Sequence, residues 1–501
     1  MADEDNACEF EYELVLREVG DFGGLEAESD QLLETCFQDH PAYVSVFEMK
    51  RFLVIGKKGS GKTAISRQLN TAQNPMVISR CFTLGDYPWT HDEMQGTLSV
   101  PEDRRNAIAW KHFLLLQLAS LVNDLDDHSL GDPDLSRSRK RVREFISDAY
   151  GSSKPKHSSV FTSSRRIWKT RTAAVDATIA QIGAEFGTIP LPPHVQEVNR
   201  TMAEHIFSLL NPGVKYFFCF DQLDDGFNSN DARYSNILTG LLLAAKDLLL
   251  AGQEYARNFC PVVLIRDDIY DLLRFPRKNQ LTENYAVSLD WQVSSNDEGN
   301  SLLELIESRI TGALNAEAED VRWEDIFESR EGEEEQDAPG AFRAICENTL
   351  VRPRDVIKFL NEVLVQLKSG GPHCPTRFDT RCVGSAREGF ARYFLKEMKD
   401  ELTGYESIPA NVWSLLEEVG GESFTLAEFE AAYLGSDPST DTRALDLIEA
   451  LFDHSILGYL DERLGQGVYC WRYNYHDCSF KRAAKQFKVH PGLQVSLGLG
   501  S

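Results

Sequence analysis

An eight-residue run near the amino terminus has the spacing of a loop that binds phosphate groups. Residues 56–63 read Gly-Lys-Lys-Gly-Ser-Gly-Lys-Thr, so that a glycine is followed after four residues by Gly-Lys-Thr. The glycines let the backbone wrap until successive amides point at the phosphates, and the next helix adds the positive end of its dipole. Lys62 would reach the β and γ phosphates, and the Thr63 hydroxyl would bind Mg²⁺. The residues expected to bind ATP are Gly56, Gly59, Ser60, Gly61, Lys62 and Thr63.

An apolar stretch in the middle of the chain leads directly into a carboxylate. Tyr216–Phe220 reads as a buried strand, and Asp221 follows it at once. A carboxylate at the end of a strand beside the phosphates holds Mg²⁺ through its water shell, so we assign the metal to Asp221 together with Thr63. An aspartate that caps a turn is the alternative.

The group that would activate water for hydrolysis is not at its usual place. Gln222 occupies the position where many ATPases carry a glutamate that polarises the attacking water. We therefore expect Asp224 to act as the base, with Asp225 as the alternative, although both carboxylates could instead cap a turn or a helix. The sequence thus predicts binding of the nucleotide at the glycine-rich loop, whereas its hydrolysis depends on a base from another position.

Two arginines are candidates for sensing the γ phosphate. Arg266 follows the apolar run Pro261–Leu264, and ligands of open α/β sheets lie at the carboxyl ends of strands. Arg354 lies at the start of a helix that Pro353 favours, where it could couple the nucleotide to the position of a lid. An ordinary ion pair is the alternative for both arginines.

The elements that must position these residues alternate between strand-like and helix-like patterns. The apolar runs expected as strands are 52–55, 76–84, 214–220, 261–264 and 286–289. A helix over Lys62–Leu69 follows the glycine-rich run, and long segments with helical spacing separate most of the later strands. Parallel strands need crossovers of this length, so we expect an α/β domain over 50–300 with a mainly parallel sheet flanked by helices.

The rest of the chain is expected to surround or follow this domain. Residues 1–49 form an acidic leader that packs on it, with a helix over Ala27–Phe37, and 132–171 interrupt it as a basic segment without clear periodicity. Residues 301–375 are expected to form a helical lid. Residues 376–501 contain helices followed by two strand-like runs, which suggests a winged-helix-like domain.

Composition and charge limit the setting in which the chain works. Its 501 residues include 52 basic and 78 acidic side chains, and the net charge of −26 repels nucleic acid and anionic membranes except at a local basic patch. The first residues lack the pattern of a secretory signal, and the apolar stretch Leu241–Ala251 is shorter than a bilayer span. Ten scattered cysteines fit reduced thiols. We expect a cytoplasmic protein that does not enter a membrane.

Two regions are candidates for binding a partner. Eleven basic residues lie from Arg137 to Arg171, and they could contact the backbone of a nucleic acid, although an acidic protein partner or plain solvation is favoured. In a winged helix, Ala444–His454 could read DNA, but its acidic residues would face phosphates poorly. We expect a protein partner or a second copy of the chain, with nucleic acid as the other class.

Several motifs also share their order with a known family. In chain order they are Ala27-Glu28-Ser29-Asp30, Pro41-Ala42-Tyr43, Gly56–Ile65, Tyr87-Pro88-Trp89, Phe220–Asp225, Leu264–Tyr270, Val351–Asp355 and Phe359-Leu360-Asn361. With them the chain resembles a bacterial group of uncharacterised P-loop ATPases related to the STAND, KAP and AAA-like classes. The resemblance implies a P-loop NTPase with an ASCE-type sheet that works on ATP as a molecular switch, in settings that include antiviral and other conflict systems. Gln222 departs from the AAA pattern.

Two functions fit these residues. In the first, the chain is an ATPase switch that depends on Mg²⁺ and is controlled by a partner, with Asp224, Arg266 and Arg354 in catalysis. In the second, it is a scaffold or oligomerisation protein that binds the nucleotide and hydrolyses little of it, which Gln222 favours.

Overall fold

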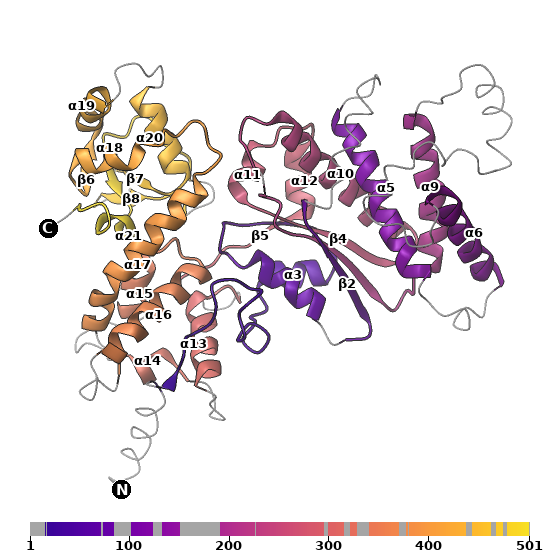
Figure 1. Ribbon diagram of the computed structural model, residues 1–501, viewed down its shortest axis with the longest axis horizontal. Coiled ribbons are helices and arrows are strands. Elements are labelled where there is room, and N and C mark those ends of the chain that lie inside the picture. The colour runs from indigo at the N-terminus through magenta and orange to yellow at the C-terminus, as the bar shows by residue number, and fades with distance from the viewer. Residues whose placement is uncertain are drawn as a thin grey trace, which may run out of the picture.

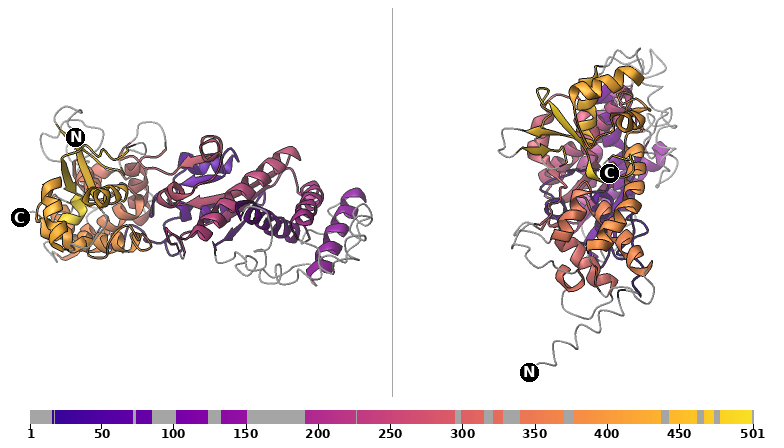
Figure 2. Two further views of the ribbon diagram at one scale, coloured as in Figure 1. Left: turned by 90° about the horizontal axis from the view of Figure 1, so that it is seen from above. Right: turned by 90° about the vertical axis from the view of Figure 1, so that its left-hand side faces the viewer.

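The computed structural model shows an elongated molecule with the expected sheet at its centre (Figures 1 and 2). The carboxyl-terminal part lies on one side of the sheet, and a group of helices extends on the other (Figure 1). The residues that the structure describes are 16, 18–71, 74–84, 102–123, 133–150, 191–225, 227–294, 299–314, 321–327, 340–369, 377–378, 380–436, 443–461, 467–473 and 478–499. The motif Tyr87-Pro88-Trp89 and the basic residues from 154 to 171 lie outside these ranges.

The central sheet consists of five parallel strands in the described part of the chain. They are β1 (Leu53–Ile55), β2 (Val77–Phe82), β3 (Lys215–Phe220), β4 (Asn258–Ile265) and β5 (Ala286–Ser288), in the order β2-β3-β4-β1-β5. Each run expected as a strand forms one of them. The register pairs Ile55 with Ile265 and Phe82 with Phe220, so the loops after these strands leave the sheet at one edge. The α/β class with a parallel sheet flanked by helices is confirmed.

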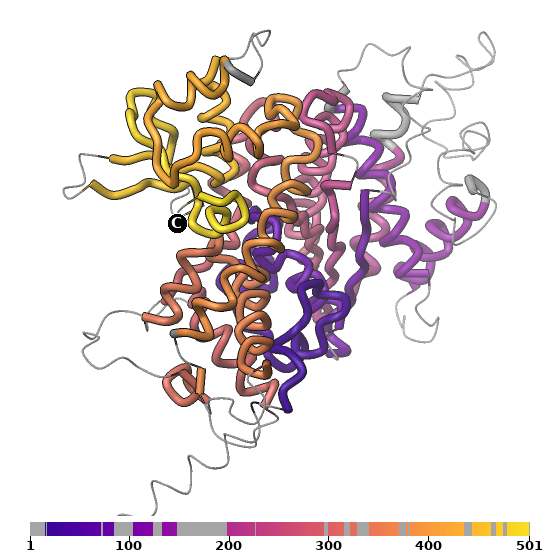
Figure 3. Tube along the Cα trace, turned by 60° about the vertical axis from the view of Figure 1, so that its left-hand side comes forward, coloured from indigo at the N-terminus to yellow at the C-terminus, as the bar shows by residue number. Residues whose placement is uncertain are grey.

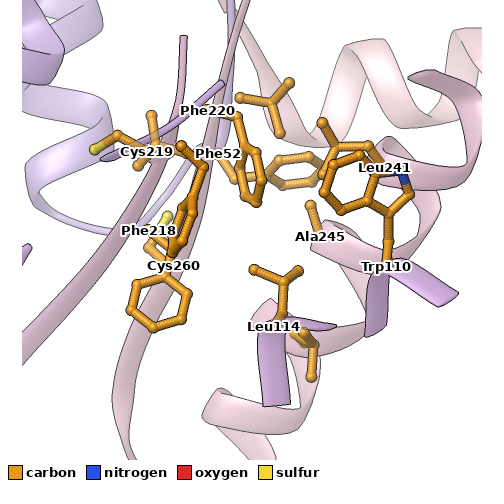
Figure 4. Packing of buried hydrophobic residues seen from close by; sticks show 14 of the residues in the cluster. Phe52, Trp110, Leu114, Phe218, Cys219, Phe220, Leu241, Ala245 and Cys260 are labelled. Atoms are coloured by element: carbon orange, nitrogen blue, oxygen red, sulfur yellow. The ribbon is translucent and has the colours of Figure 1, made fainter. Parts of the chain in front are cut away.

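Helices cover both faces of this sheet. One face carries α5 (Glu102–Asn123) and α10 (Ala232–Glu254), with α9 (Leu191–Leu209) and α6 (Pro133–Tyr150) packed outside them. The other face carries α2 (Pro41–Phe47) and α3 (Lys62–Thr71). Trp110 of α5 and Leu241 of α10 lie near Phe220 of β3, with the rings of Trp110 and Phe220 5.4 Å apart (Figure 4). Phe217, which points to the opposite face, stacks on Phe47 of α2 at 6.1 Å. Successive side chains of β3 point to opposite faces of the sheet, and because helices cover both faces, both faces of this strand are buried.

Helix α10 is the described helix whose length and composition would allow it to cross a bilayer. Its most apolar window has a mean hydropathy of 1.3, but 61% of that window is buried inside the protein. Contacts with α5 and β4 account for this burial. The helix therefore serves as a core helix of the α/β part.

The basic segment expected as an interruption is helical where the structure describes it. Helix α6 buries Val142 and Ile146, and Arg139 is also buried and donates to the backbone oxygen of Asn123 at 3.1 Å. The helical spacing of its few apolar residues is masked in the sequence by the many charges between them. The prediction of no periodicity is therefore wrong for this part of 132–171.

The chain after the sheet forms further helices and a second sheet. The helices are α11 (Asp267–Leu272), α12 (Lys278–Tyr285), α13 (Leu302–Ala313), α14 (Trp323–Ile326), α15 (Gly340–Glu347), α16 (Pro353–Ser369), α17 (Thr380–Glu401), α18 (Val412–Val419), α19 (Leu426–Ser436), α20 (Ala444–Asp453) and α21 (Pro491–Gln494). The antiparallel strands β6 (Ser423–Thr425), β7 (Leu457–Asp461), β8 (Val468–Cys470) and β9 (Gln486–Val489) pair in the order β6-β9-β7-β8. The short strands β6 and β9 were not expected.

Most of the buried apolar residues that the structure describes form two hydrophobic clusters. The first contains the parallel sheet and its helices, from Ala42 to Leu289. The second extends from Leu302 to Leu499, so the helices expected as a lid share one core with those of the carboxyl-terminal part. Phe22 of the leader belongs to the second cluster as well.

The leader lies along the second cluster without forming the expected helix. Figure 3 shows it as an indigo strap beside the orange helices. Residues of Ala27–Phe37 form turns, so the prediction of a helix there is wrong. The Asp30 carboxylate accepts the amides of Gly24 and Leu32, each at 3.2 Å, and an aspartate that binds nearby amides in this way competes with helix formation.

Candidate functional site

A cavity of about 530 Å³ opens at the carboxyl end of the parallel sheet. The glycine-rich loop, the leader and the start of α16 form its other walls. The expected site residues that line it are Gly59, Gly61, Lys62, Thr63, Asp221, Asp224, Arg266 and Arg354. Its volume is in the range of cavities that hold small ligands. The structure thus brings residues from four distant segments to one place.

The leader and α13 contribute residues to this cavity that were not expected from the sequence. Glu28 and Asp30 of the leader and Arg309 of α13 line it together with the glycine-rich loop. The sequence gives no spacing that links them to the loop. The run Ala27-Glu28-Ser29-Asp30 in the family resemblance is the one signal that singled out part of this segment.

The glycines of the loop have steric reasons for their positions. Gly59 and Gly61 have φ angles of 80° and 104°, in the left-handed region that favours glycine. A Cβ atom on Gly56 would lie 2.7 Å from Ser60 Oγ, which is closer than such atoms approach. Ser60 Oγ is itself buried and has no hydrogen-bond partner among the described residues. Gly56 and Ser60 therefore support the loop without lining the cavity, whereas Gly59 and Gly61 line it.

Lys62 is folded back onto the loop that precedes it. Its Nζ atom donates to the backbone oxygens of Gly56 and Lys57, at 2.8 Å each. Burial lowers the pKa of Lys62 to about 8, although Asp267 acts in the opposite direction. Lys62 is also the first residue of α3, so the positive end of that helix borders the cavity beside it. This arrangement is suited to an anion.

Thr63 and Asp221 line the same cavity, and the Thr63 hydroxyl acts to lower the pKa of the Asp221 carboxyl. The Oδ1 atom of Asp221 accepts the amide of Gln222 at 2.9 Å. Burial nevertheless raises the pKa of Asp221. A buried carboxylate and a hydroxyl are oxygen ligands that Mg²⁺ prefers, and a bound cation would act on Asp221 in the same direction as Lys62, against the effect of burial. The two residues therefore fit a magnesium ion.

Arg266 is held by two carboxylates. Its Nε and Nη2 atoms donate to Asp268 at 3.0 and 2.5 Å, and its Nη1 atom donates to Asp224 at 3.3 Å. Burial would raise the pKa of Asp268, but Arg266 and Tyr405 outweigh it and hold that pKa at about 2. The two expected residues Asp224 and Arg266 thus pair with each other. Asp225, the alternative base, is not among the residues that line the cavity.

Arg352 and Arg354 lie side by side at the start of α16 but have different surroundings. Arg352 is buried and donates to the backbone oxygen of Lys58, to Glu401 and to Asp355, at 2.7 Å each. Arg354 lines the cavity, with its side chain one quarter exposed, and its Nε atom donates to the backbone oxygen of Leu25 at 3.1 Å. Arg352 therefore stabilises the glycine-rich loop through the backbone of Lys58. Of these two arginines, Arg354 is the one that a ligand in the cavity could reach.

Comparison with known proteins finds a described family of domains that is similar to one part of the chain. Residues 300–399, from α13 into α17, match the FunZ-associated C-terminal helical domain. The chain is also 22% identical over 363 residues to a protein of Escherichia coli (strain K12) that is named for transposon gamma-delta and for its mass of 80.3 kDa. That match covers 68% of this chain and 46% of the other, so the chain spans less than half the length of this relative. The FunZ-associated region contains Arg309, Arg352 and Arg354, which surround the cavity or its loop.

Proposed function

We propose that the chain is a P-loop ATPase that binds ATP with Mg²⁺ and acts as a switch under the control of a partner. The observation that carries this proposal is the meeting of Lys62, Thr63 and Asp221 in one cavity. Lys62 and the amides of the loop would bind the phosphates, and Thr63 with Asp221 would hold the magnesium ion. When bound, Mg²⁺ would neutralise charge that develops on the phosphates.

The order of the strands supports membership in the P-loop ATPases related to the STAND, KAP and AAA-like classes. Strand β4 lies between β1, which leads into the loop, and β3, which leads into Asp221. This insertion of one strand is the arrangement that an ASCE-type sheet has. Arg266 follows the inserted strand, where it can lie near both the loop and Asp221.

The carboxyl-terminal part supports the proposal of a switch. The elements α18, β6, α19, α20, β7 and β8 follow one another in the order of a winged helix. This part contacts the loop directly, because Lys57 Nζ donates to the backbone oxygen of Tyr473 at 3.2 Å. A conformational change in the loop on binding or hydrolysis of ATP would therefore be transmitted to the carboxyl-terminal part and to a partner bound there.

We propose that this switch works in the cytoplasm.

Isothermal titration with ATP and Mg²⁺ tests the binding half of the proposal. Lys62→Ala is expected to abolish binding, and Asp221→Asn to remove the dependence of the affinity on Mg²⁺. Lys50→Ala is the matched control, since Lys50 is exposed and pairs only locally with Glu48. Failure of the wild-type chain to bind ATP would reject the proposal.

A phosphate-release assay tests the hydrolysis half. It is run with the chain alone, with nucleic acid and with proteins that co-purify with the chain. The alternative, a scaffold regulated by the nucleotide, is favoured by the amide of Gln222 at the place of a catalytic glutamate. Binding of ATP without release of phosphate in every condition would establish that alternative.

A further inference from the structure

Position 222 lacks a carboxylate, but another segment of the chain brings one to it. Gln222 lines the cavity, and its Nε2 atom donates to Glu28 Oε1 at 3.1 Å. The two residues are 194 positions apart in the sequence. Glu28 lines the same cavity as Lys62 and Asp221, and its charge acts together with burial to raise the pKa of Asp221. A carboxylate from the leader thus stands beside the position where many ATPases have their own.

Asp224, the base expected from the sequence, is engaged elsewhere. Its Oδ2 atom accepts from Arg266 at 3.3 Å, and Arg266, whose side chain is 11% exposed, is also bound to Asp268. Asp224 therefore belongs to an ion-pair network with Arg266 and Asp268. The contact described for Glu28 is instead with the neutral amide of Gln222, at the position where many ATPases carry their glutamate.

The leader holds Glu28 at this place through several contacts of its own. Asp30 accepts from Arg309 at 2.6 Å, and both side chains are almost completely buried. The backbone oxygen of Leu25 accepts from Arg354. Because these contacts lie on either side of Glu28 along the chain, its exposed side chain starts from a fixed backbone.

We propose that Glu28 is the general base of this ATPase, held in place by Gln222. The proposal rests on the proposed function. The oxygen of a water molecule forms a bond to the γ phosphorus, and the bond from that phosphorus to the β,γ-bridging oxygen breaks with its electron pair left on ADP. The water proton passes to the Glu28 carboxylate and then to the solvent, which restores the base.

Steady-state phosphate release, with ATP affinity measured separately on the full chain, tests this role. Glu28→Gln is expected to lower kcat about 100-fold or more, the effect typical of losing a general base, and to leave the affinity for ATP with Mg²⁺ within about twofold. Asp39→Asn, an exposed position of the same leader outside the cavity, is expected to match the wild type. The double variant Glu28→Gln with Gln222→Glu is expected to recover at least about tenfold in kcat, because it returns a carboxylate to the usual position.

The outcomes separate this proposal from the proposed function. If the wild type releases phosphate and Glu28→Gln does so equally well, Glu28 is not the base and the ATPase stands. If Glu28→Gln loses affinity for ATP and the double variant recovers nothing, the role of Glu28 is structural. If the wild type binds no ATP, the proposed function itself fails.

Discussion

Tyr405 and Asp268 connect the carboxyl-terminal part of the molecule to the edge of the parallel sheet. The Tyr405 hydroxyl donates to Asp268 Oδ2 at 2.6 Å, and the same carboxylate binds Arg266 of the candidate site. The ring of His454, at the end of α20, lies 4.4 Å from that of Tyr405 in an edge-on arrangement. Two contacts therefore link Arg266 to Tyr405, and a displacement of Arg266 would be transmitted to the carboxyl-terminal part of the molecule through them.

Replacement of Tyr405 by phenylalanine is expected to loosen this connection. Hydrogen bonds to charged groups contribute about 1.5–3 kcal/mol, so we expect the free energy of unfolding to fall by about 2 kcal/mol. Tyr405 keeps its ring contact with Phe227, 5.1 Å away, in this variant. Chemical denaturation measures the change. The control is Tyr469→Phe, whose exposed hydroxyl donates to Ser423 at 3.2 Å and should contribute less than about 0.5 kcal/mol. Equal losses in both variants would contradict a special role for the Tyr405 contact.

Replacement of Arg352 or Arg354, the two neighbouring arginines at the start of α16, by alanine is expected to have different effects. Arg352→Ala leaves the buried carboxylates of Asp355 and Glu401 without their partner, which should lower the free energy of unfolding by about 3–5 kcal/mol. Arg354→Ala removes a partly exposed side chain and should cost less than about 1 kcal/mol. In contrast, Arg354→Ala should reduce the turnover of ATP at least about tenfold if Arg354 reaches the γ phosphate. Denaturation and phosphate release on both variants decide this. Full turnover in Arg354→Ala would remove it from the catalytic residues.

The sequence predicts the part of the site that depends on local patterns. The glycine-rich run, the strand before it and the aspartate after β3 each follow from residues that are close together in the chain. The edge at which Lys62, Thr63 and Asp221 meet then follows from the parallel arrangement of the strands. For this reason Gly59, Gly61, Lys62, Thr63 and Asp221 are found in one cavity.

The leader could not be predicted in this way because long-range contacts determine it. Its apolar residues suggest a helix over Ala27–Phe37, yet Asp30 binds Arg309, which is 279 positions away, and the amides of its own neighbours. A buried ion pair of this kind outweighs a modest helical preference. The place of Glu28 in the cavity depends on the same contacts, so periodicity gives no sign of it. Likewise, only the fold reveals that Arg266 and Asp224 pair with each other.

The buried pair of Asp30 and Arg309 is expected to hold the leader on the molecule. Asp30→Asn removes the negative charge beside a buried guanidinium, and we expect it to lower the free energy of unfolding by about 3 kcal/mol. Limited proteolysis should then cut the leader faster than in the wild type, because local opening exposes it. Asp39→Asn is the control, as Asp39 is exposed in the same leader. Unchanged stability and unchanged cleavage in Asp30→Asn would show that the pair does not fasten the leader.

His490 is expected to make the stability of the protein depend on pH. Burial lowers the pKa of His490 to about 3 in the folded chain, whereas an unfolded chain has a value near 6.5. The unfolded chain therefore takes up a proton as the pH falls below about 6.5 and the folded chain does not, so the folded state loses about 2 kcal/mol between pH 7 and 5. His490→Asn keeps an acceptor for the amide of Gly492, which His490 Nδ1 binds at 3.1 Å, but cannot titrate. Denaturation at both pH values should show a smaller loss in this variant, by about 2 kcal/mol, even if its stability at pH 7 is lower. Equal losses in the two proteins would exclude His490 as the source of the pH dependence.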